Sequence, residues 1–109
     1  MLTACLALTI HLGIGPGWND IHPCVRYEEG PVAVGAYLNS MYEVSSYLTY
    51  TYGDEWFIEG GLVTGYMLPL TPMVRAGHKV DDVIYFVSPA WSDYEGGSVG
   101  VVLGIERRF

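Results

Sequence analysis

Residues 2–13, which read LTACLALTIHLG, carry the clearest pattern in the chain. Aliphatic residues occupy its even positions from Leu2 to Leu12, and small or polar residues occupy its odd positions. Side chains of an extended chain point alternately to opposite faces, so this period of two predicts a strand with one aliphatic face and one polar face. The same alternation returns in residues 42–52, 56–66 and 99–107, which predicts an all-β protein.

Turn-forming residues divide the chain into about eight such segments. The connections are too short for crossover helices, so neighbouring strands should pair antiparallel as a meander. We expect residues 1–109 to form a single domain, either a small closed β-barrel, which has no exposed edges and which we favour, or a β-sandwich. The expected strands are Leu2–Gly13, Ile21–Glu28, Val32–Leu38, Tyr42–Tyr52, Glu55–Tyr66, Met73–Gly77, Val83–Ser88 and Ser98–Arg107.

The charge balance restricts the class of partner. The chain has a formal net charge of -7, and only 16% of its residues are charged. Nucleic-acid binding needs a basic surface that faces phosphates, so we expect no nucleic-acid partner. An acidic balance fits solubility or a protein partner with a basic surface.

The first residues carry an ambiguous targeting signal. Residues 3–10 are apolar enough to resemble the hydrophobic region of a signal peptide, but no basic segment precedes them and no small-x-small cleavage site follows. Residues 2–5 match a lipobox in letters, with only Met1 before them. No segment approaches the length of a membrane helix. We therefore expect the host cytoplasm or a virion rather than the outer membrane.

The two cysteines are too few for a disulfide scaffold. In a hairpin centred near Trp18, Cys5 would lie opposite about residue 29 and Cys24 opposite about residue 10. A disulfide requires the two Cα atoms to approach within about 7 Å. We therefore expect two free thiols.

The second, non-aliphatic face of the strands carries few charges, and these nearly balance. In a soluble domain this face would be solvated, and the aliphatic face would form a core. Sparse charges among small residues are also typical of the lumen of a small outer-membrane barrel, whose aliphatic face meets lipid. We keep a miniature membrane barrel as an alternative. The polar face carries His11, Arg26, Tyr37, Glu43, Glu59, Arg75 and Glu106; the soluble core would contain Leu6, Leu8, Val34, Leu48, Leu62, Val101 and Leu103.

The sequence offers one set of candidate catalytic residues. His22, Asp20 and Ser40 could compose a small hydrolytic site if the fold brought them within about 3 Å of one another. The chain has no G-x-S-x-G nucleophile elbow. Its three histidines are scattered, so we expect no metal site and no cofactor.

In the order of several short, glycine-rich motifs, this chain resembles a group of small, mostly uncharacterised phage and prophage proteins. These motifs are residues 11–13, 19–23, 35–40 and 64–66, together with a final strand that ends near Gly104. In that group a glycine commonly follows the proline matching Pro23, where this chain has Cys24. The resemblance implies a phage origin and a compact β-fold, and it brings no catalytic residues.

We therefore predict a non-enzymatic, phage-type β-barrel that acts through contact with a protein, either in the virion or on a host factor. Aromatic residues among acids make good anchors for such contacts. The membrane barrel and the small hydrolase are the alternatives. The expected contact residues are Trp18, Asp20, Trp91, Asp93, Tyr94 and Glu95.

Overall fold

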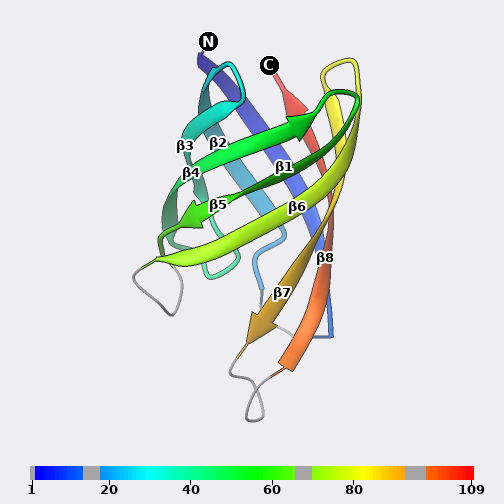
Figure 1. Cartoon of the computed structure of the whole chain (residues 1–109). Coiled ribbons are helices and arrows are strands. Elements are labelled where there is room, and N and C mark those ends of the chain that lie inside the picture. Colours follow the sequence, from blue (N-terminus) through cyan, green and yellow to red (C-terminus); the bar gives the residue numbers. More distant parts are fainter. Residues whose placement is uncertain (1, 14–17, 66–69, 93–97) are drawn as a thin grey trace.

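The computed structural model describes residues 2–13, 18–65, 70–92 and 98–109, without the side chains of Trp91, Ser92 and Ser98. Eight strands form a closed antiparallel barrel in sequence order, and β8 pairs with β1 (Figure 1). The predicted all-β barrel is confirmed. The strands are β1 (Leu2–Leu12), β2 (Ile21–Glu29), β3 (Val32–Leu38), β4 (Val44–Gly53), β5 (Trp56–Val63), β6 (Thr71–Val80), β7 (Val83–Ser92) and β8 (Ser98–Arg108).

The two ends of the barrel have different connections. Both termini lie at the end with the short turns, residues 30–31, 54–55 and 81–82 (Figure 1). Gly30 and Asp81 have φ values of 60° and 56°, as tight hairpin turns require. The strands that the longer connections join end at the opposite end of the barrel. These connections comprise residues 13–20, 39–43, 64–70 and 93–97 of the sequence. We call the two ends the short-turn end and the long-connection end.

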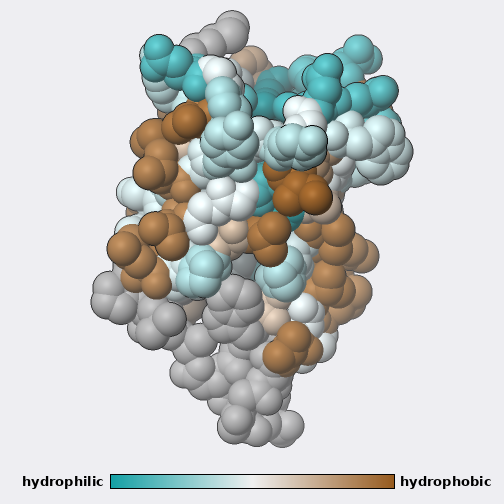
Figure 2. Space-filling model, viewed as in Figure 1, coloured by the Kyte–Doolittle hydropathy of each residue, from teal (hydrophilic) through white to brown (hydrophobic). Residues whose placement is uncertain are grey.

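The aliphatic face of the strands points outward. The prediction of an aliphatic core is therefore wrong for most of its members, because alternation separates two rows of side chains without deciding which row faces inward. Apolar residues cover much of the outer wall, whereas polar residues gather at the short-turn end (Figure 2). Val101 is half-buried; the exposed members of the predicted core are Leu6, Leu8, Val34, Leu48, Leu62 and Leu103.

The inward face contains glycines that make room for rings on the neighbouring strand. Gly104 pairs directly with Phe86, and a Cβ at Gly104 would lie 2.2 Å from that ring. The same arrangement joins Gly77 to Phe57. Glycine therefore lets an aromatic ring lie across the adjacent backbone inside a narrow barrel.

Cys5 and Cys24 form a disulfide, so the prediction of two free thiols is wrong. The two residues are direct partners in the β1–β2 ladder, with Cα atoms 4.9 Å apart. The expected register placed the hairpin centre near Trp18, but this ladder ends at the pair Leu8↔Ile21. β1 continues past that pair to Leu12 and pairs there with β8, so the connection is asymmetric.

Candidate functional site in the barrel lumen

Six charged side chains form a closed ring across the lumen. Arginines and glutamates alternate around it, so the ring has no net charge. Its members come from β2, β5, β6 and β8, and its most deeply buried member, Glu59, also accepts a hydrogen bond from Thr49. The links are Arg26–Glu59 (2.8 Å), Glu59–Arg75 (2.7 Å), Arg75–Glu106 (3.0 Å), Glu106–Arg108 (3.0 Å), Arg108–Glu28 (2.9 Å) and Glu28–Arg26 (3.3 Å).

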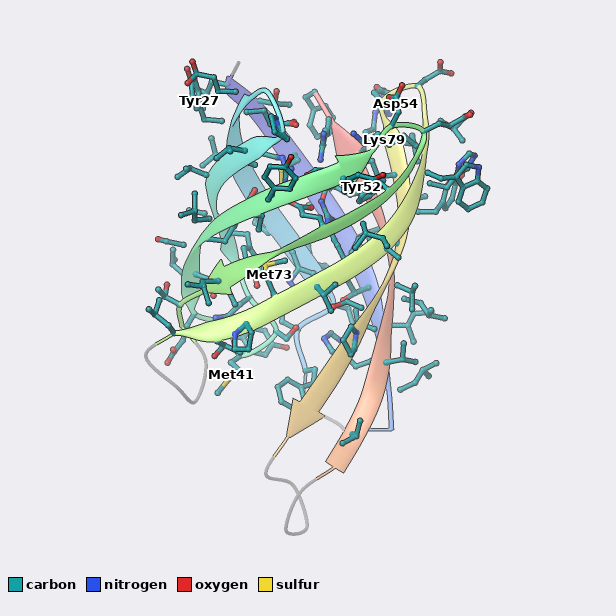
Figure 3. The ribbon with its side chains drawn as sticks, in the orientation of Figure 1. Tyr27, Met41, Tyr52, Asp54, Met73 and Lys79 are labelled. Carbon is teal, nitrogen blue, oxygen red and sulfur yellow. A yellow bond between two sulfur atoms is a disulfide. The ribbon has the colours of Figure 1, made fainter. Side chains whose placement is uncertain are left out.

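Aromatic rings flank the charged ring. The Arg75 guanidinium lies 4.9 Å from the centroid of Phe86 and 5.7 Å from that of Phe57. On the short-turn side, the ammonium of Lys79 lies 5.2 Å from the Phe57 ring, and Ile84 is fully buried. Figure 3 labels Lys79 near this end of β6. The lumen is therefore filled from the charged ring toward the short-turn end.

On the other side of the ring the lumen is hollow. A cavity of about 600 Å³ extends from Arg26, Glu59 and Arg75 toward the long-connection end. This volume is in the range of small-molecule sites. Apolar residues supply most of the exposed wall surface, among them Val63, Met73, Phe86 and Val102. Polar residues are interspersed with them, among them Thr9, His11, His22, Tyr37, Ser40 and Thr71.

His22 lies in the cavity wall with both ring nitrogens engaged. Its Nδ1 donates to the Leu38 carbonyl at 2.8 Å, because a carbonyl can only accept. The neutral ring then accepts at Nε2 from the Thr9 hydroxyl, also at 2.8 Å. These two bonds tie β2 to β3 and β1, so His22 has a structural role here.

His11, rather than His22, lies between Asp20 and Ser40. The Asp20 carboxylate accepts from His11 Nδ1 at 3.0 Å, and Nε2 lies 2.7 Å from the Ser40 hydroxyl. The side chain of His11 is only 4% exposed. The Trp18 ring stacks on it with centroids 5.8 Å apart. The fold therefore brings together two of the three predicted catalytic candidates, but on a different histidine.

Two buried asparagines fix the connections that carry Asp20 and Ser40. The Asn39 amide oxygen accepts from the backbone N–H groups of Met41 and Glu43, and its nitrogen donates to Ser45 and to Gly65. Asn19 donates from its backbone to the Ser40 carbonyl at 2.9 Å. Its side chain also bonds Ile21 and Asn39, which closes the contact between the two connections.

The predicted protein-contact residues are only partly described. Trp18 is half-buried against His11, and Asp20 is exposed. Trp91 belongs to β7, and its side chain lies outside the described residues. Asp93, Tyr94 and Glu95 also lie outside them. A contact surface at these positions stays a prediction.

The role of His11 escaped the sequence interpretation because it depends on the register. His11 lies on the same inward row as Thr9, beyond the last β1–β2 pair, and Asp20 returns beside it through the bond from Thr9 N to Asp20 O. The signal that could have identified it was its place on the polar face of the first strand, close to the loop that carries Asp20.

Comparison with protein-family models, with curated proteins and with solved structures found no match. Among the described residues, no group of three or more His, Cys, Asp or Glu is arranged to hold a metal ion. The same part of the chain contains no helix with the length and hydropathy of a membrane span.

Proposed function

We propose that this protein is a membrane-embedded β-barrel of the outer-membrane type, with a ligand-sized cavity in its lumen. The observation that carries the proposal is the inverted distribution of side chains. Arg26, Glu59 and Arg75 are buried, whereas aliphatic residues from every strand are exposed on the outer wall. Figure 2 shows apolar residues over much of the face in view. Large apolar surfaces on a soluble monomer are unusual, and a lipid-facing aliphatic band explains this one.

The outward-facing charges support the same proposal. Among the described residues, the charges on the outer face of the strands are Glu29 and Arg107, and both lie close to the short-turn end. Arg107 pairs there with Asp82 at 3.5 Å. The middle of the outer wall is thus free of described charges, as the hydrocarbon region of a bilayer requires.

Aromatic side chains gather around the short-turn end on the outer face. Figure 3 shows Tyr27 and Tyr52 near this end and Met41 near the opposite one. Tyrosine and tryptophan prefer the boundary between lipid and water because their rings are apolar and their polar atoms need partners. The exposed aromatic residues near the short-turn end are Tyr27, Tyr50, Tyr52, Trp56, Tyr85 and Phe109.

The connections and the disulfide fit this class of protein. Outer-membrane barrels have short turns on the periplasmic side and longer extracellular connections. By that rule the short-turn end, with both termini, faces the periplasm. The Cys5–Cys24 disulfide fits an oxidising compartment rather than the cytosol. A phage origin and a protein partner remain separate predictions, and no contact within the described residues favours them.

The proposal is tested by refolding into phospholipid vesicles and by placing a charge on the outer wall. Leu48 is 54% exposed in the middle of β4. In lipid, Leu48→Arg should lower the free energy of unfolding by about 2–4 kcal/mol, measured by urea denaturation. In water, a substitution at such an exposed site would change it by about 0.5 kcal/mol or less.

Val80→Arg is the matched control, because Val80 ends β6 beside the short turn. A charge there should cost at most about 1 kcal/mol in lipid. Folded, monodisperse protein in detergent-free buffer, with Leu48→Arg as stable as the parent, would contradict the membrane proposal.

A further inference from the structure

The His11 contacts match the donor and acceptor pattern of a serine nucleophile with its base. The Asp20 carboxylate can only accept, so Nδ1 of His11 carries a proton and Nε2 of the neutral ring faces the Ser40 hydroxyl at 2.7 Å. This is the tautomer that a general base needs in order to take the proton of a serine. Triads are recognised by this geometry and not by the order of residues in the chain.

The three residues are held in place from both sides. Trp18 stacks on His11, which restricts the orientation of the imidazole. Asn39 holds the connection that carries Ser40 through its bonds to Met41 and Glu43, and the bond from Asn19 N to Ser40 O joins this connection to the one that carries Asp20. A catalytic group gains most when its neighbours fix its position before substrate binds.

Ser40 and His11 both line the cavity, so a molecule inside the cavity can reach the serine. The walls beyond them are largely apolar and include Val63, Met73 and Val102. A flexible hydrocarbon chain would fill this space, with a carbonyl carbon at its end near Ser40. The cavity ends at the charged ring, which limits how far such a chain could extend.

We propose that Ser40, His11 and Asp20 form a hydrolytic centre for carboxylic esters, with the acyl chain of the substrate in the lumen cavity. The Ser40 oxygen attacks the ester carbonyl, and its proton passes to His11 Nε2. The bond to the alcohol oxygen breaks, and the alcohol leaves with that proton. Water then attacks the acyl-serine with His11 as base, which releases the acid and restores the serine. Ester and water thus give acid and alcohol, with no other reactant.

His22 is not the base of this centre. Its two ring nitrogens are bonded to Leu38 and Thr9, which leaves neither directed at Ser40. Asp20 orients His11 and stabilises the imidazolium that forms during the reaction, as the acid of a triad does. Because its side chain is 62% exposed, its contribution should be smaller than that of a buried acid.

The test uses the full chain folded in detergent micelles, with p-nitrophenyl octanoate as substrate and a fluorophosphonate as the covalent probe. The probe should label Ser40, identified by mass spectrometry of the labelled peptide. Ser40→Ala and His11→Gln should each lower kcat/KM by at least about 100-fold, because nucleophile and base act as a unit. Asp20→Asn should cause a smaller loss, mainly in kcat.

Ser46→Ala and His78→Gln are the matched controls, since both residues face outward, and His78 stacks on Trp56. Both controls should keep the parent's turnover and labelling. Absence of labelling in the parent, labelling that persists in Ser40→Ala, or loss in His22→Gln with retention in His11→Gln would each overturn the proposal. Folding is scored separately by heat-dependent electrophoretic migration, so this failure is distinct from failure of the membrane proposal.

Discussion

The two halves of the lumen contain similar polar residues but differ in how these residues are packed. Toward the short-turn end, charged and aromatic side chains fill the barrel, and every charge in the ring has two partners of opposite sign. Toward the long-connection end, the polar side chains lie around a cavity of about 600 Å³. We therefore expect the filled half to contribute most to stability, whereas the hollow half has a histidine and a serine beside the cavity.

The largest expected effect comes from opening the charged ring. Arg75→Met removes the partner that Glu59 and Glu106 share, and it leaves both buried carboxylates with one fewer cation. Breaking a buried ion pair on one side costs about 3–5 kcal/mol. Urea denaturation in vesicles should show a loss of this size in the free energy of unfolding.

The control for the ring is Arg107→Met. Arg107 pairs with Asp82 on the outer surface, and its side chain is 63% exposed. An exposed pair contributes at most about 1 kcal/mol. Equal effects of the two substitutions would show that the ring does not stabilise the filled half.

An intermediate effect is expected from the Cys5–Cys24 disulfide, which lies beside the ring on the inward face of β1 and β2. Its sequence separation of 19 residues corresponds to about 3 kcal/mol of stabilisation by restriction of the unfolded chain. Dithiothreitol should lower the urea midpoint of the parent and leave a Cys5→Ser/Cys24→Ser double variant unchanged. Titration of two free thiols in the unreduced, unfolded protein would contradict this pairing.

A smaller loss of stability is expected in the hollow half. Asn39→Ala leaves the backbone N–H groups of Met41 and Glu43 without their side-chain acceptor, at a cost of about 2 kcal/mol. Because Asn39 positions the connection that carries Ser40, fluorophosphonate labelling should fall as well. Parent-like labelling in a destabilised Asn39→Ala variant would show that the position of Ser40 does not depend on Asn39.

The sequence predicted the strands and the polar row well, because both follow from a local period of two. Arg26, Glu59, Arg75 and Glu106 were expected on one face, and all four face the lumen. The direction of that face could not follow from alternation, because a soluble and a lipid-facing barrel share the same pattern.

The register and the site depended on features that are not local. Cys5 and Cys24 became partners because the β1–β2 connection is asymmetric, which the length of residues 13–20 does not reveal. Because of the same asymmetry, Asp20 lies beside β1, where its carbonyl accepts from Thr9 N and its carboxylate contacts His11. The bounds of β6 were also missed. The expected strand began at Met73, after Pro72, but β6 begins at Thr71 and continues through Pro72.

The charged ring also constrains the order of folding. Arg108 and Glu28 are 80 residues apart in the chain, and β1 lies between their strands. This link cannot form until β8 has met β1, whereas each hairpin can pair locally. Until closure, the four buried charges of the ring keep their hydration, which the closed barrel then removes. Closure of the barrel between β8 and β1 and dehydration of these buried charges are therefore coupled.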